Sequence, residues 1–229
     1  MELVTLQDVS KTYAGPDGGV LALRDISLSI WSGEFMAIVG PSGSGKSSLL
    51  HILGGMMTPT TGRVVIGNVE VFRLSQDALA DFRRNHLGFV FQQHHLIPYL
   101  TALENVLLPL AVDRNHSNGR SRADRALAAL ERVGLRQRAH HLPDQLSGGE
   151  QGRVAIARAI VNDPHLILAD EPTGSLDSAT GGAILEVFAE LNRQGHTIVV
   201  VTHSPRTAEI AQRVITMQDG AIHSERGNP

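Results

Sequence analysis

The stretch VGPSGSGKSSLL, residues 39–50, decides how this sequence folds, and it continues directly from the apolar run FMAIV at residues 35–39. It contains three glycines, four serines and one lysine. Of the chain's 20 basic residues, 18 are arginines, and Lys46 is one of only two lysines. A compact ammonium group on a flexible stem fits a tight loop better than a planar guanidinium does. We infer that the chemistry at this position requires lysine.

The same stretch fits the phosphate-binding pattern GxxxxGK[ST] over residues 40–47. A buried strand is expected before it and a helix after it, from residue 47 to about residue 53. Glycines let successive N–H groups turn inward around a phosphate, and the helix N-terminus adds its positive dipole end. A glycine–serine turn without a ligand is the alternative, but it does not explain the flanking strand and helix. The nucleotide-binding residues expected here are Gly40, Pro41, Ser42, Gly43, Ser44, Gly45, Lys46, Ser47 and Ser48.

A second element, LILADE at residues 166–171, is an apolar run that ends in two acids. Such a strand places Asp170 at its carboxyl end, where ligands lie in open α/β sheets. We expect Asp170 to bind Mg²⁺ through water, together with the Ser47 hydroxyl. Glu171 is expected to act as general base on the water that attacks a nucleotide phosphate. The alternative is that the two acids only cap a buried strand.

The bulk composition indicates a globular protein. A chain of 229 residues with 42% hydrophobic residues can bury a full core as one domain. The formal charge of −3 gives no sign of a nucleic-acid-binding surface, and the absence of cysteine excludes disulfides and thiolate metal sites. We see no signal peptide, and the longest apolar runs are far below the roughly 18 residues of a membrane span. If the protein works at a membrane, we expect another chain to provide the spans.

Strands alternate with helices along the chain, which indicates a mostly parallel α/β core. Residues 1–30 are expected to form antiparallel strands around a turn at residues 14–19, and residues 64–71 a hairpin around Gly67-Asn68. Residues 101–134 are helical in pattern, apart from a polar, loop-like segment at 113–122, and another helix follows Ser147. We predict a single domain, in which residues 1–92 and 161–229 form the phosphate-binding core with a β subdomain. Residues 93–160 are predicted to form an inserted helical subdomain.

The segment LSGGEQ at residues 146–151 resembles the signature motif of ABC ATPases. The resemblance covers nearly the whole chain, and it implies a RecA-like P-loop core with an N-terminal antiparallel β subdomain and an inserted α-helical subdomain. In that family the signature binds the γ-phosphate of ATP held by the other subunit, so the resemblance implies a homodimer. A serine hydroxyl, bare glycine N–H groups and a helix N-terminus together suit an anion. The residues expected to act in trans are Ser147, Gly148, Gly149 and Glu150.

Further family motifs match in order. Gln92 resembles the Q-loop glutamine, a ligand of Mg²⁺ and water; Asp177 resembles the D-loop acid; and His203 resembles the switch histidine that contacts the γ-phosphate. Tyr13 resembles the aromatic residue that stacks on adenine. The resemblance thus implies ATP and Mg²⁺ as cofactors. It implies catalytic roles for Glu171, His203, Gln92 and Lys46, and metal binding by Ser47, Gln92 and Asp170.

Residues 89–106, FVFQQHHLIPYLTALENV, and residues 168–174, LADEPTG, look like the ATPase subunits of lipoprotein-releasing and MacB-type systems. This resemblance implies a peripheral protein at the cytoplasmic face of the inner membrane, docked to a permease near residues 93–104. FtsE-like and heme-exporter ATPases are alternatives within the family. Beyond it stand a non-transport ABC protein, a monomeric P-loop small-molecule kinase and a non-hydrolysing ATP-dependent clamp.

Two features depart from the expected pattern. Gly152 occupies a position where this group usually carries glutamine, and we expect it to weaken the first turn of the signature helix and to alter the contact with the partner. The eleven histidines are scattered except for the pairs His94-His95 and His140-His141. Because adjacent residues point to different sides, we expect exposed or packing roles rather than a metal site.

Overall fold

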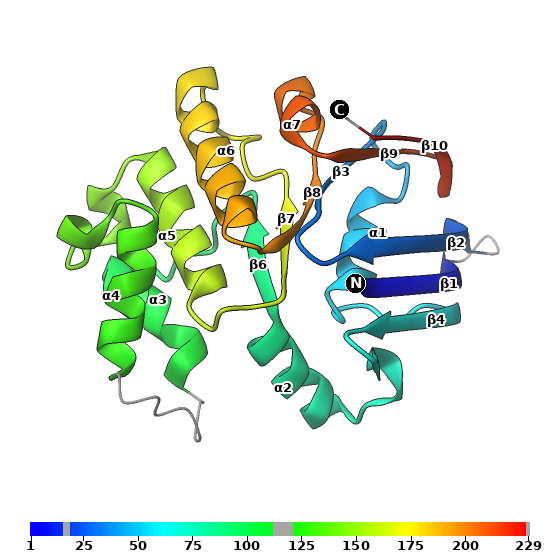
Figure 1. Ribbon diagram of the computed structural model, residues 1–229, viewed down its shortest axis with the longest axis horizontal. Coiled ribbons are helices and arrows are strands. Elements are labelled where there is room, and N and C mark those ends of the chain that lie inside the picture. The colour runs from blue at the N-terminus through cyan, green and yellow to red at the C-terminus, as the bar shows by residue number, and fades with distance from the viewer. Residues whose placement is uncertain (16–18, 112–120, 228–229) are drawn as a thin grey trace.

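The computed structural model describes residues 1–15, 19–111 and 121–227, and it contains two sheets with helices around them (Figure 1). The smaller sheet is antiparallel, in the order β2-β1-β4-β5, as expected for the N-terminal strands. Part of the turn at residues 14–19 lies outside the described residues. The strands of this sheet are β1 (Glu2–Tyr13), β2 (Val20–Trp31), β4 (Thr61–Ile66) and β5 (Val69–Glu70).

The larger sheet has six strands in the order β10-β9-β3-β8-β7-β6. Its neighbours from β9 to β6 pair in parallel, and only β10 is antiparallel to its neighbour. The mostly parallel core predicted from the alternation of strands and helices is confirmed. The strands are β3 (Phe35–Val39), β6 (Leu87–Phe91), β7 (Leu166–Asp170), β8 (Thr197–Val201), β9 (Arg213–Gln218) and β10 (Ala221–Gly227).

The central strands are apolar at almost every position because both faces of the sheet are covered. Successive side chains point to opposite faces, so they enter two different cores. In β3, Phe35 and Ala37 join the core on the helical side, whereas Met36 and Ile38 join the core shared with α1 (Lys46–Leu53) and the antiparallel sheet. This arrangement fixes the sheet between two layers and leaves its strand ends to form a site.

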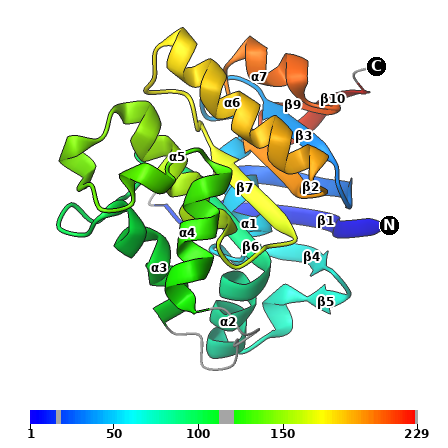
Figure 2. The same ribbon diagram turned by 60° about the vertical axis from the view of Figure 1, so that its left-hand side comes forward.

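Three helices stand together beside β6 in both views: α3 (Ala102–Ala111), α4 (Arg122–Arg132) and α5 (Gly148–Ile160) (Figures 1 and 2). Their apolar side chains belong to the same core as one face of the large sheet. The capping pair expected before α4 is present, since Ser121 and Asp124 cap each other's backbone. Most of the polar segment at 113–122 lies outside the described residues.

The remaining helices are α2 (Gln76–His86), α6 (Ser178–Arg193) and α7 (Pro205–Ile210), with short 3₁₀ turns at Val71–Arg73, Arg136–Arg138 and Pro143–Gln145. The sequence pattern predicts α6 but neither α2 nor α7. In α2 no residue is fully buried, so its apolar stripe is too weak to stand out. Across the described ranges, no helix has the length and apolarity that a membrane span requires.

Candidate nucleotide site

Four parallel strands end at the same edge of the large sheet, and the chain segments that follow them build the site. The register places Phe91 of β6 beside Asp170 of β7, and Asp170 beside Val201 of β8. Gln92, Glu171 and Thr202 therefore leave the sheet together. Because the carboxyl ends of parallel strands are where α/β folds bind ligands, the topology brings the expected polar residues to one place.

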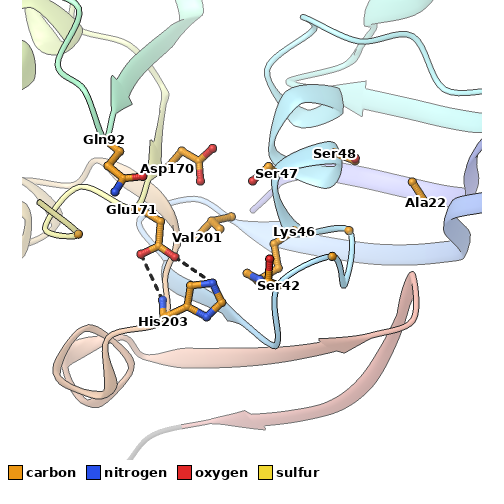
Figure 3. Close-up of a pocket in the computed structure, with 13 residues that line it drawn as sticks. Ala22, Ser42, Lys46, Ser47, Ser48, Gln92, Asp170, Glu171, Val201 and His203 are labelled. Carbon is orange, nitrogen blue, oxygen red and sulfur yellow. Dashed lines mark hydrogen bonds and ion pairs between the residues drawn. The ribbon is translucent and has the colours of Figure 1, made fainter. Parts of the chain in front are cut away.

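A cavity of about 610 Å³ lies at this edge. Figure 3 shows Lys46 and three serines of the glycine-rich stretch on one side, facing Gln92, Asp170, Glu171 and His203 on the other. Residues that lie far apart in the sequence thus face a common space, as the motifs predict. The cavity is lined by Ala22, Ser42, Gly43, Gly45, Lys46, Ser47, Ser48, Gln92, Asp170, Glu171, Gly174, Val201 and His203.

Lys46 is buried, and its Nζ donates to the carbonyl oxygens of Gly40 at 2.9 Å and Pro41 at 2.8 Å. Burial lowers the pKa of Lys46, while the carboxylates of Glu171 and Asp170 oppose this shift. The ammonium group therefore sits inside the curve of its own loop, within the field of the two acids. Gly40 and Pro41 do not line the cavity; they hold the lysine that does.

The N-terminus of α1 has no side-chain cap, whereas Ser75, Ser121, Ser147 and Asp177 cap α2, α4, α5 and α6. The residue in the capping position is Gly45, with a φ of 98°. A Cβ there would collide with the carbonyl oxygen of Ala22, so only glycine fits. The first amides of α1 are thereby left open toward the cavity, which is the arrangement that binds phosphate at helix N-termini.

The acidic side of the cavity centres on Glu171. This residue adopts a left-handed conformation, with a φ of 46°, and its amide donates to the carbonyl of Val201 at 2.9 Å. The backbone N–H of His203 donates to Glu171 Oε2 at 3.2 Å, and His203 Nε2 lies 3.4 Å from Oε1 (Figure 3). The carboxylate is aimed and steadied by the residue expected to be its partner. A left-handed glutamate is uncommon and often marks a functional position.

Three oxygen-bearing side chains expected to bind a metal, Ser47, Gln92 and Asp170, line the same cavity. They supply a hydroxyl, an amide and a carboxylate, the hard oxygen ligands that Mg²⁺ prefers. The donor set therefore fits Mg²⁺. Ser44, by contrast, is buried in the loop behind the cavity, and its Oγ has no hydrogen-bond partner among the described residues.

The signature residues do not reach this cavity in their own chain. Ser147 caps α5 by accepting from the Glu150 amide, and the Glu150 carboxylate accepts from the Ser147 amide at 2.8 Å. That backbone N–H lowers the pKa of Glu150. Gly148 and Gly149 form the first turn, and Gly152 has not broken the helix, which runs on to Ile160. Asp177 caps α6 in the same way, through the amides of Ala179 and Thr180.

Tyr13 lies next to the cavity rather than in its lining. Its hydroxyl is 3.0 Å from the Oγ of Ser48, which does line the cavity, and its side chain is 38% exposed. Sequence reasoning missed Ala22, Gly174 and Val201 as lining residues. Ala22 and Val201 carry no chemically distinctive group, and only the strand register could have placed them there.

The fold and the cavity together define a P-loop nucleotide-binding protein. A family model described as ABC transporter matches residues 23–174, which is more than half of the chain. The chain therefore belongs to the ABC transporter family.

Individual relatives agree with this assignment. The chain is 50% identical over 224 residues to the macrolide export ATP-binding/permease protein MacB of Chlorobaculum tepidum, covering 98% of this chain but only 34% of that protein. It is 49% identical to an uncharacterised ABC transporter ATP-binding protein, MJ0796, of Methanocaldococcus jannaschii, over 97% of this chain and 96% of that one. The chain thus spans about a third of the length of the MacB relative.

A solved structure of MJ0796, described as a dimeric post-hydrolysis state bound to ADP and Pi, matches with a TM-score of 0.89. It is 47% identical and covers 98% of both chains. At this level of identity the two chains share their fold over nearly their whole length.

Proposed function

We propose that this chain binds ATP with Mg²⁺ and hydrolyses it, and that two copies dimerise around ATP to drive a membrane permease of the lipoprotein-releasing or MacB-like export type. The observation that carries the proposal is the convergence of Lys46, Asp170, Glu171 and His203 on one cavity beside the uncapped N-terminus of α1. A phosphate-binding lysine and a general base on opposite sides of one space are what phosphoryl transfer to water needs.

In this proposal the triphosphate lies on the glycine-rich loop and on the first amides of α1, and Lys46 turns to its β- and γ-phosphates. Ser47, Gln92 and Asp170 hold Mg²⁺, which stabilises negative charge on the phosphate oxygens. Glu171 takes a proton from the attacking water. His203, already bonded to Glu171 through its backbone N–H, keeps the carboxylate oriented and contacts the γ-phosphate.

The proposed dimer completes each site with Ser147 and the two following glycines of the other chain. The Oγ of Ser147 accepts from the Glu150 amide, so its own proton remains able to donate to a phosphate oxygen. Asp177 at the start of α6 is proposed to lie at the same interface. The dimeric form of MJ0796 supports this arrangement by similarity.

We propose that residues 93–160 move as one helical subdomain relative to the core formed by residues 1–92 and 161–229. The grouping of α3, α4 and α5 away from the antiparallel sheet supports this division (Figure 1). The proposed subdomain carries the signature at one end and the segment after Gln92 at the other. Motion at the nucleotide can therefore reach a membrane partner through it.

The proposed permease contact is the segment 93–104 with the groove beside it. A hollow of about 490 Å³ is lined by α2, β6, Pro109, Arg158 and His95, and Tyr99 nearby is 88% exposed. Pro98 keeps the segment out of a regular helix or a central strand. Occupation of this groove by a permease helix would hold the protein at the cytoplasmic face of the inner membrane as a peripheral subunit.

The test of hydrolysis is Glu171→Gln, which keeps the size of the side chain but removes the base. We expect the rate of ATP hydrolysis to fall about 10²–10⁴-fold while ATP still binds and dimers accumulate. Phosphate release and size-exclusion chromatography with ATP measure the two effects. Glu186→Gln, at an exposed glutamate of α6, is the matched control and should hydrolyse like wild type. A Glu171→Gln chain with near wild-type rates would overturn the assignment of the base.

The test of the permease contact is Tyr99→Glu, which places a charge on the exposed segment. We expect the variant to keep ATP hydrolysis and to lose co-purification with its permease, because a carboxylate is costly to bury in an apolar interface. Val20→Glu, at an exposed position of the antiparallel sheet, is the control. If the Tyr99→Glu chain co-purifies and transports normally, the contact lies elsewhere.

A further inference from the structure

Gly152, on α5, creates space for a side chain from another part of the molecule. The residue is buried, and a Cβ built on it would lie 3.1 Å from Cδ1 of Ile184 and 3.3 Å from Cε1 of His94. The imidazole of His94 therefore lies against the bare backbone of the helix. A glutamine, the residue expected at this position, would compete with His94 for the same space.

His94 sits in a turn that its neighbours must hold in place. His94 has a φ of 57° and His95 a φ of 48°, so two successive non-glycine residues are left-handed. Such residues are uncommon, and each stores backbone strain that the surroundings must offset. The His94 side chain is only 7% exposed, and burial together with the charge of Arg158 lowers its pKa. An uncharged ring packed on α5 is one of the two contacts that hold the turn.

Arg158 provides the second contact, also from α5. Its Nη1 donates to the carbonyl of His95 at 2.7 Å, and its Nη2 donates to the carbonyl of His94 at 2.5 Å. The left-handed turn aims both carbonyls at the same guanidinium, and the rigid fork of arginine uses both. Neither contact is available to an extended backbone, so the shape of the turn and the helix surface depend on each other.

The two contacts join parts of the site that lie on different elements. The turn begins two residues after Gln92, which lines the nucleotide cavity, and α5 begins at Ser147, the start of the signature motif. We propose that His94, Gly152 and Arg158 form a latch that fixes the position of the signature serine relative to Gln92. These are positioning residues, and the inference rests on the proposed ATP hydrolysis by a dimer.

The latch makes a size-swap experiment possible. Gly152→Gln should displace His94 and reduce the kcat for ATP about 10- to 100-fold, the scale expected when reacting groups shift by roughly 1 Å. His94→Asn, which tolerates the left-handed turn but leaves the space above Gly152 unfilled, should reduce kcat with no added bulk. The double variant should regain about tenfold over Gly152→Gln alone, because the glutamine then occupies the space of the ring. Binding of a fluorescent ATP analogue to the single chain should change less than about twofold, since none of the three residues lines the phosphate loop.

His95→Asn is the matched control. It alters the neighbouring left-handed residue, keeps the carbonyl that Arg158 uses and removes a ring that packs on Phe91 rather than on Gly152. Its kcat should stay close to that of wild type. The latch is wrong if His94→Asn and His95→Asn have the same kcat, or if kcat falls only together with ATP affinity.

Amide hydrogen exchange tests the latch without relying on hydrolysis. In His94→Asn, exchange at residues 93–97 and in the first turn of α5 should rise together, because each holds the other. If only residues 93–97 exchange faster, the two segments are not coupled and the latch is overturned. A wild-type chain that does not hydrolyse ATP would instead refute the proposed function, and the exchange result would still decide the latch.

Discussion

The two edges of the six-stranded sheet are built from the same strands but use their polar groups in opposite ways. At the carboxyl edge, polar side chains surround a cavity, and Glu171 Oε1 is buried without a hydrogen-bond partner among the described residues. At the amino edge, polar side chains are bonded to one another. Polar groups left open at one edge and satisfied at the other mark the edge where a ligand binds.

The amino edge shows how complete this pairing is. Asn192 donates to the carbonyls of Gly33 and His196, at 2.8 Å and 3.0 Å, and the Gly33 amide donates to Thr197 Oγ1 at 2.9 Å. Nδ1 of His196 lies 3.2 Å from the carbonyl of Pro164, so Nδ1 carries the proton and Nε2 accepts from Arg132 at 2.8 Å. This network ties the end of α4 to the start of β8.

The difference predicts which changes alter activity and which alter stability. Substitutions at the carboxyl edge remove groups that serve a ligand, and they should spare folding. Substitutions at the amino edge leave a buried partner unsatisfied, and they should lower stability while the chemistry persists. Three predictions test this separation, beginning with the largest expected effect.

Lys46→Ala should weaken ATP binding by about 2–5 kcal/mol, the cost of losing one partner of a buried charged contact. The free energy of unfolding without nucleotide should change little. Isothermal titration calorimetry and urea unfolding measure the two quantities. Lys11→Ala, at the only other lysine, is the control and should bind ATP far more tightly than Lys46→Ala. Tight ATP binding by the Lys46→Ala chain would remove the distinction between the edges.

Arg132→Ala should lower the free energy of unfolding by about 1–3 kcal/mol, because it leaves Nε2 of the buried His196 without its donor. ATP affinity should stay within about twofold, since the change lies at the opposite edge of the sheet. The control is Arg193→Ala, which breaks a surface pair with Glu190 worth at most about 1 kcal/mol. Equal losses in the two variants would mean that the amino-edge network adds nothing beyond surface contacts.

The smallest effect concerns pH. Burial lowers the pKa of His196 in the folded chain, with Arg132 acting in the same direction and the Pro164 carbonyl and Asp163 opposing it. The unfolded chain then binds more protons just below the ordinary histidine pKa of about 6.5, so this stability is complete above that pH and is lost as the pH falls. His196→Gln should therefore lose less stability than wild type between about pH 7.5 and about pH 5.5.

Urea unfolding at both pH values measures this prediction, and His140→Gln, at an exposed histidine, is the control. Burial also lowers the pKa of His86 and His94, so part of the acid sensitivity should remain in the variant. The paired carboxylates, whose pKa values are lowered, titrate below this range. If His196→Gln and wild type lose equal stability, the ring does not report pH.

The parallel core and the phosphate loop could be predicted because their signals are local. The apolar run at Phe35–Val39 and the glycine spacing after it predict β3 and α1, and the structure places their boundaries within one residue. The order of Gln92, Asp170 and His203 after three apolar runs predicts that they meet, since parallel strands end at one edge. Here sequence pattern and topology agree.

What could not be predicted depends on contacts between distant segments. Ala22 lines the cavity only because of the register of a hairpin, and its side chain carries no chemical signal. Gly152 was expected to weaken its helix, yet the helix is intact and the glycine accommodates His94, which lies 58 residues earlier in the sequence. A pattern of one segment cannot reveal a space that two segments share.

The two hydrogen bonds from Lys46 to the carbonyls of its own loop have a consequence for how quickly and how cheaply a nucleotide is taken up. They hold the loop in a curved shape before any phosphate arrives, so the conformational entropy of that curve is lost during folding and not on binding. An arriving phosphate exchanges two bonds of the ammonium group for two others within a rigid cradle. A loop curved around its own lysine is thus preorganised, and nucleotide exchange needs no refolding of the site.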